Sequence, residues 1–180
     1  NPPNMVSGWA SATFGGSPLT DKRSICTLPE SQRPVMMWLD ATNNLWKCAT
    51  WDWSTMDYGS AVSVSGEAAD DTITGMYGAI TAVSETSLLA VVVEGDTSAE
   101  LIARVYESAD AGATWSLAAE GGTPTVNDYT NKARLFWVPE EASLLLLLEY
   151  TVAGRQQVEQ YASSDFGATW SSIGEITDNT

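Results

Sequence analysis

The stretch SADAGATWS at residues 108–116 occurs again as SSDFGATWS at residues 163–171. Seven of the nine positions are identical, and the second copy begins 55 residues after the first. A weaker third copy, TMDYGS at residues 55–60, precedes them and keeps the Asp and the Gly but not the Trp. A fixed period of this length indicates a fold built from repeated units.

The sequence on either side of each copy keeps the same period. Glu30, Glu85 and Glu140 are each 55 residues apart, and each follows a short extended stretch. Every unit contains four such stretches, and the Asp/Gly turn lies between the third and the fourth. The predicted strands are 25–28, 35–39, 45–53 and 61–65 in the first unit, 80–83, 88–93, 101–107 and 115–119 in the second, and 135–138, 144–150, 157–163 and 170–173 in the third.

The apolar pattern predicts an all-β fold. The second stretch of each unit is nearly continuous in apolar residues, which is typical of a strand buried on both faces. No window of 12 or more residues shows the apolar stripe of a helix. Four-stranded antiparallel units that bury both faces against their neighbours favour the blades of a β-propeller over a sandwich. We predict blades at about 20–67, 72–120 and 127–175 in a module spanning 20–180, after an extended arm at 1–19 whose residues 9–14 could add an edge strand.

Three blades do not close a ring, because propellers close with about 4 to 8 blades. The two outward blade faces would expose Leu and Val, and large exposed apolar surfaces promote association. We therefore expect either a longer chain, a homo-oligomer in which two copies give six blades, or burial against another protein in a larger assembly.

The repeated turn resembles the Asp-box, also called the bacterial neuraminidase repeat. This family includes sialidases, other glycosidases, sortilin-type receptors, photosystem assembly factors and phage tail proteins. The resemblance implies a sialidase-like propeller in which the box is the hairpin between the third and fourth strands of a blade. It does not select one function among those of the family.

Turn chemistry explains the residues of the box. An Asp carboxylate can accept backbone N–H bonds within the turn, and Gly supplies a position with positive φ. The Ser hydroxyl can bond back across the loop, and the Trp ring can pack beneath the hairpin. We predict this structural role for Asp57, Gly59, Ser108, Asp110, Gly112, Thr114, Trp115, Ser163, Asp165, Gly167, Thr169 and Trp170.

Composition excludes several classes of protein. The chain has 8 basic and 23 acidic residues, a formal net charge of −15, and no histidine. Nucleic-acid binding and adsorption to anionic membranes both require clustered Lys and Arg, and here they are scattered. Without histidine there is no Ser-His-Asp or Cys-His catalysis, and we expect no cofactor and no metal site.

The two cysteines and the longest apolar run give two further expectations. Cys26 and Cys48 fall on the first and third strands of one unit, and two strand spacings of ~4.8 Å exceed the roughly 7 Å reach of a disulfide. We therefore predict two buried free thiols. The longest wholly apolar run, 144–148, is too short for a membrane-spanning helix, and the acidic composition favours an extracellular or virion-surface location.

A binding site in a propeller is expected at the axis, on the innermost strands and the loops that enter them. The repeat register makes 22, 77 and 132 equivalent positions, and Arg134 corresponds to Ser24 and Ala79. The candidate ligand-binding residues are Lys22, Arg23, Tyr77, Lys132, Arg134 and Asp128, and the alternative is that they are solvated loop residues. We assign no catalytic residue.

Two functions are compatible with these observations. The first is a non-enzymatic module for binding or assembly that recognises a glycan or a protein partner, such as a phage tail or capsid appendage. The alternative is a fragment of a sialidase-like glycoside hydrolase. That family uses three arginines, a Tyr–Glu pair and an Asp, but its Arg-Ile-Pro signature is absent, and the nearest string is QRPV at residues 32–35.

The first unit also contains a cluster of tryptophans, at positions 38, 46, 51 and 53. Trp51 and Trp53 share one face of a strand while Trp46 points to the other, because side chains alternate along a strand. The cluster is either an aromatic platform that stacks on sugar rings or part of the packing between blades.

Overall fold

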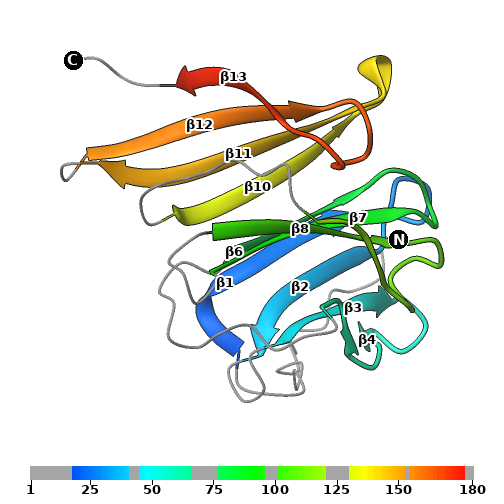
Figure 1. The fold of residues 1–180 in the computed structure, drawn as a ribbon. Coiled ribbons are helices and arrows are strands. Elements are labelled where there is room, and N and C mark those ends of the chain that lie inside the picture. Colours follow the sequence, from blue (N-terminus) through cyan, green and yellow to red (C-terminus); the bar gives the residue numbers. More distant parts are fainter. Residues whose placement is uncertain are drawn as a thin grey trace, which may run out of the picture.

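The computed structural model describes residues 18–40, 45–65, 77–95, 101–120, 130–152 and 155–176, and they form three antiparallel sheets (Figure 1). Blade 1 contains β1 (Pro18–Thr27), β2 (Pro34–Asp40), β3 (Leu45–Asp52), β4 (Asp57–Tyr58) and β5 (Val62–Ser63). Blade 2 contains β6 (Tyr77–Ala82), β7 (Leu88–Gly95), β8 (Leu101–Ser108) and β9 (Ser116–Glu120). Blade 3 contains β10 (Thr130–Val138), the 3₁₀ turn η1 (Pro139–Glu141), β11 (Ser143–Val152), β12 (Arg155–Ser163) and β13 (Ser171–Ile176).

The three sheets are blades of a β-propeller, and the predicted all-β class is confirmed. In blades 2 and 3 each strand pairs with the next one along the chain, and blade 1 does the same as far as β4, while β5 returns to pair with β3. Each sheet is therefore a meander that begins at its inner strand. The inner strands β1, β6 and β10 lie side by side, with β6 in contact with both of the others. The predicted blade boundaries remain predictions, and the predicted arm lies outside the described residues apart from positions 18 and 19, which belong to β1.

The core lies between the blades, in two layers. Met37 and Trp46 of blade 1 pack against Ala90 of blade 2 in the first layer. In the second, Val91 and Val105 of blade 2 pack against Leu146 of blade 3. Because residues alternate between the two faces of a strand, consecutive residues of β7 enter different layers. This double burial explains the near-continuous apolar sequence of the second strands.

The outward face of blade 3 is open. Phe136 on β10 and Ile176 on β13 are 45% and 54% exposed, and the pairing register places both on the side away from blade 2. The outward face of blade 1 is different: Ile25 at its inner edge is 60% exposed, but Trp38 and Ala49 in its middle are only 1% and 3% exposed. The middle of this second face is therefore closed to solvent.

Both cysteines are free, which confirms that prediction. Cys48 is buried between blades 1 and 2, whereas Cys26 is half-buried rather than buried. Its strand β1 pairs only with β2, so one edge of that strand has no strand alongside it within its own sheet. Burial raises the pKa of both thiols to about 12. Among the described residues, no helix has the length and apolar character needed to cross a membrane.

Candidate functional site

The turns at residues 108–115 and 163–170 have the same hydrogen bonds. Asp110 accepts the Thr114 N–H at 2.8 Å, the Thr114 hydroxyl at 2.6 Å and the Ser108 hydroxyl at 2.8 Å. The Ser108 Oγ in turn accepts the N–H of Gly112 at 2.9 Å, and Gly112 has φ of 90°. Asp165, with Ser163, Gly167 and Thr169, repeats this arrangement. The donors come from the turn itself, which supports a structural role for these carboxylates.

Each of these turns also packs against the preceding blade. The Trp115 indole N–H donates to Cys48 Sγ at 3.1 Å, and the Thr50 hydroxyl donates to the Ala111 carbonyl at 2.8 Å. In the next turn, Gly167 lies against the side chain of Val105 in blade 2. The turn therefore joins a blade to its neighbour as well as closing its own hairpin.

The same hydrogen bonds predict a loss of stability in acid. Bonds from the threonine hydroxyls, followed by the threonine N–H groups and the serine hydroxyls, lower the pKa of Asp110 and Asp165 from 3.8 to about 2. A folded-state pKa below the unfolded value stabilises the fold above the unfolded pKa, and this contribution is lost as the pH falls from about 4 to about 2. Thermal unfolding of the wild type should therefore show a falling Tm across this window. The double variant Asp110→Asn/Asp165→Asn should have a flatter profile, and parallel profiles would contradict the assignment.

The corresponding turn of blade 1 has different residues. Cys48 pairs with Val62 in blade 1, and Val105 pairs with Ala119 in blade 2. These equivalent pairs align each residue of the blade 1 turn with the residue 57 positions later in blade 2. Trp51, Trp53 and Tyr58 then stand where blade 2 has Ser108, Asp110 and Trp115. The structure places Asp57 on β4 and Gly59 just after it, so the aligned position of Asp57 is Thr114.

The predicted fourth strand of blade 1, 61–65, is shortened to β5, and β4 also pairs with β3. Gly59 does not have positive φ, and the left-handed residue of this turn is Met56, at φ 56°. The sequence alignment by Asp and Gly therefore differs from the structural alignment by four residues.

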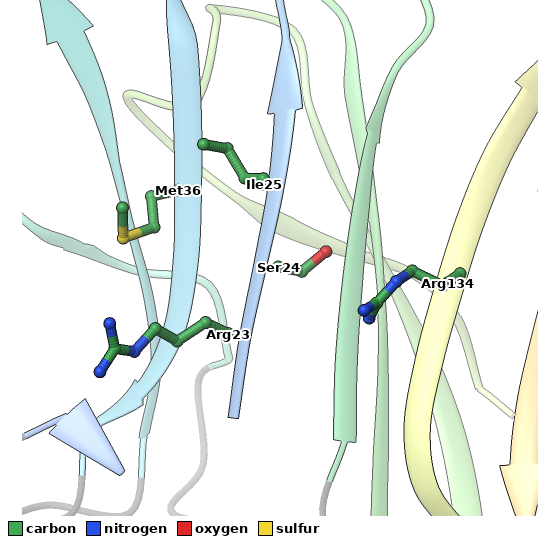
Figure 2. Close-up of a pocket in the computed structure, with 5 residues that line it drawn as sticks. All are labelled: Arg23, Ser24, Ile25, Met36 and Arg134. Atoms are coloured by element: carbon green, nitrogen blue, oxygen red, sulfur yellow. The ribbon is translucent and has the colours of Figure 1, made fainter. Parts of the chain in front are cut away.

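A shallow depression of about 300 Å³ lies on the inner strands β1 and β10 and on the neighbouring β2, and is lined by Arg23, Ser24, Ile25, Met36 and Arg134 (Figure 2). Arg134 reaches from β10 toward β6 and β1, whereas Arg23 extends from β1 over β2, away from Arg134, so the two guanidinium groups do not converge. The Arg134 Nη1 donates to the Ala133 carbonyl at 2.9 Å. Ser24 accepts the N–H of Ile80 at 3.2 Å and so links β1 to β6.

Two of the six candidate ligand-binding residues therefore line one depression, namely Arg23 and Arg134. Lys132 is exposed and forms an ion pair with Glu149 at 3.6 Å. Tyr77 is half-buried and packs against the core between blades 2 and 3. The side chain of Lys22 and the whole of Asp128 lie outside the described residues.

Sequence reasoning named Ser24 only as the position equivalent to Arg134, and it missed Ile25 and Met36 of the depression. The strand period could have found Ile25, which shares a face with Arg23, and the β1–β2 register then pairs it with Met36. Among the described residues, no group of three or more His, Cys, Asp or Glu side chains is placed to hold a metal ion.

Comparison with known proteins supports the fold. No family model matches the chain, and no curated protein matches it. Solved structures do match: a Hadza microbial sialidase, Hz136, has a TM-score of 0.58 at 15% identity, with 86% of this chain and 33% of the sialidase covered. An α-L-arabinanase of Penicillium chrysogenum has a TM-score of 0.56 at 13% identity, with 87% and 49% covered.

An N-acetylgalactosamine deacetylase from F. plautii is also similar, with a TM-score of 0.57, 9% identity, and 85% of this chain and 51% of the deacetylase covered. This chain thus spans about half of the arabinanase and the deacetylase, and a third of the sialidase. At such identities the likeness concerns the fold alone. The described residues form three blades with a sialidase-like β-propeller fold.

Proposed function

We propose that this chain is a non-enzymatic module that binds an acidic glycan at the depression on its inner strands. The observation that carries the proposal is the pair Arg23 and Arg134 on one apolar surface, in a chain with a net charge of −15. A guanidinium group can bind a carboxylate through two parallel hydrogen bonds, and Ile25 and Met36 offer apolar contact to a sugar ring.

Solved structures of similar fold support a glycan as the ligand. They include a sialidase, an arabinanase complexed with arabinobiose and a deacetylase in complex with blood group B trisaccharide. Hydrolysis of a glycosidic bond usually needs two carboxyl groups that flank it. The five residues that line the depression include no carboxylate, and its two guanidinium groups do not converge on one point, which favours binding over hydrolysis.

We also propose an assembly role on an extracellular or particle surface, as a homo-oligomer or as part of a larger particle such as a phage tail or capsid. The exposed Phe136 and Ile176 on the outward face of blade 3 support it, because large apolar side chains left open to solvent on a sheet face promote association. The acidic, histidine-free composition is compatible with such a location.

Replacing Arg134 tests the glycan site. Arg134→Ala should weaken binding of a sialylated oligosaccharide by roughly tenfold or more, because a hydrogen bond to a charged group contributes about 1.5–3 kcal/mol. Arg155→Ala is the matched control, since Arg155 is also exposed but begins β12, away from the depression. Binding is measured by a glycan array and by titration calorimetry of the best ligand.

The enzyme alternative is tested with the same proteins. Turnover of a fluorogenic sialoside by the wild type, abolished in Arg134→Ala, would support a hydrolase. Binding without turnover would support the module. Equal binding by Arg134→Ala and Arg155→Ala would contradict the proposed site.

A further inference from the structure

We propose that blade 1 carries a second binding site, an aromatic platform formed by Trp51, Trp53 and Tyr58, and that this platform binds a neutral glycan. It lies at the β3–β4 hairpin, where blades 2 and 3 have the hydrogen-bonded turns described above. None of its three residues lines the depression between Arg23 and Arg134.

The three rings form one contiguous cluster with an exposed member. Trp51 packs edge-on against Trp53, with centroids 5.9 Å apart and planes at 73°, and against Tyr58 at 5.1 Å and 82°. Trp51 and Tyr58 are half-buried, whereas Trp53 is 51% exposed. An indole with this exposure offers an apolar surface on which the C–H groups of a sugar ring can stack, while its polar edge stays hydrogen-bonded.

The platform is held in place before any ligand binds. The Trp53 indole N–H donates to the Ser31 carbonyl at 3.3 Å. The loop of Ser31 is in turn held by Glu85 of blade 2, whose Oε2 accepts the N–H groups of Glu30 and Ser31 at 3.0 and 3.1 Å. A side chain fixed in this way loses less conformational freedom on binding, which favours affinity.

The polar groups beside the rings favour a neutral ligand. Asp52 accepts the N–H and the hydroxyl of Ser54 at 2.8 and 2.7 Å, and Asp57 accepts the N–H of Tyr58 at 2.8 Å. Each carboxylate has a second oxygen that can accept a sugar hydroxyl. The nearby cation, Arg33, already interacts with Glu85 at 3.9 Å. Two carboxylates would repel an acidic glycan, so the expected ligand has hydroxyl groups and no charge.

Packing of another blade is the competing explanation, because the equivalent residues of blade 2 contact the blade before it. Trp115, which corresponds to Tyr58, donates to Cys48 of blade 1. A blade placed against the outward face of blade 1 would have to cover its middle as well. Trp38 and Ala49 are already closed to solvent there, whereas Trp53 remains exposed. The platform is therefore accessible while the middle of the same face is already closed, which favours a ligand over another blade.

Affinity electrophoresis through gels containing soluble xylan, mannan, β-glucan, arabinan or galactan tests the platform. The wild type should be retarded by at least one of these neutral polysaccharides, and Trp53→Ala should lose roughly fivefold or more of that affinity. Phe166→Ala is the matched control: Phe166 is 52% exposed in the turn of blade 3, and blade 2 already has Ala111 at that position. Phe166→Ala and Arg134→Ala should both bind these polysaccharides like the wild type.

The controls separate this site from the depression and from assembly. Circular dichroism should show that Trp53→Ala is folded, as expected for an exposed side chain, and Trp53→Phe should keep part of the affinity. Lack of retardation by all five polysaccharides, or equal losses in Trp53→Ala and Phe166→Ala, would overturn the proposal. So would light scattering in which Trp53→Ala turns an oligomer into a monomer, since the platform would then be an interface between copies. Loss of acidic-glycan binding in Arg134→Ala alone concerns only the depression.

Discussion

Gly167→Ala should destabilise the protein by about 2–4 kcal/mol, measured as the free energy of unfolding in urea. Gly167 has φ of 90°, and a left-handed backbone costs a residue with a Cβ about 1–2 kcal/mol. The added Cβ would also lie 2.6 Å from Cγ2 of Val105, a buried and β-branched side chain that has few alternative rotamers. Overpacking at such a position costs about 1–3 kcal/mol more.

Two other glycines serve as controls that separate strain from packing. Gly174 has φ of 126°, but nothing lies within 4 Å of an added Cβ, so Gly174→Ala should show only the backbone cost. At Gly112 the nearest atom is Leu88 Cδ1 at 3.2 Å, which gives an intermediate case. We expect losses in the order Gly167, Gly112, Gly174. Equal losses at the three positions would show that the turn of blade 3 does not pack tightly on blade 2.

The packing of each turn against the preceding blade restricts which residues the turn can contain, and this explains why the repeat is recognisable in the sequence. In blades 2 and 3 the turn needs Asp to accept several donors and Gly for positive φ, and few other residues meet these requirements. The second strands were equally easy to predict: β7 contributes residues to both layers of the core, so nearly all of its residues are apolar. The class, the number of blades and the order of the strands follow from these two constraints.

Blade 1 shows where sequence reasoning failed. Its turn has the same length as that of blade 2 between paired positions, but aromatic residues replace the serine and aspartate. Because the serine and aspartate are absent, the sequence comparison aligned Asp57 and Gly59 with the Asp and Gly of the other turns. In the structure these two residues lie four positions away from that alignment. Strand pairing fixes the equivalence in the folded chain, and a single sequence contains no direct record of pairing.

The candidate site was predictable in position but not in detail. Repeat register placed Arg23 and Arg134 on inner strands, and both line the depression. The direction in which each guanidinium group extends depends on its side-chain rotamer, and Met36 joins them only through the β1–β2 register. Repeat equivalence also could not reveal that Lys132 pairs with Glu149, since the two lie 17 positions apart on neighbouring strands.

Trp46→Ala should have an effect at least as large as that of Gly167→Ala, a loss of about 3–5 kcal/mol in the free energy of unfolding. Trp46 is fully buried between blades 1 and 2, and its ring lies directly against the backbone of Gly78 on β6. Removing the ring would leave a cavity that the sheets on either side are too rigid to fill. Trp53→Ala is the control within the same blade, and its exposed ring should contribute less than about 1 kcal/mol.

Gly78→Val provides a sharper test, because whether it lowers or raises the free energy of unfolding should depend on the presence of Trp46. A Cβ on Gly78 would lie 2.6 Å from Cζ3 of Trp46 and 2.6 Å from Cε of Met37, so Gly78→Val alone should destabilise the protein by about 1–3 kcal/mol. In the Trp46→Ala background the ring is gone and only the flexible end of Met37 has to move. There Gly78→Val should fill part of the cavity and stabilise the protein, with a coupling energy of at least about 1 kcal/mol. Additive losses would mean that β6, the inner strand of blade 2, does not pack against Trp46. The position of β1 beside β6 would then be wrong, and so would the depression that depends on it.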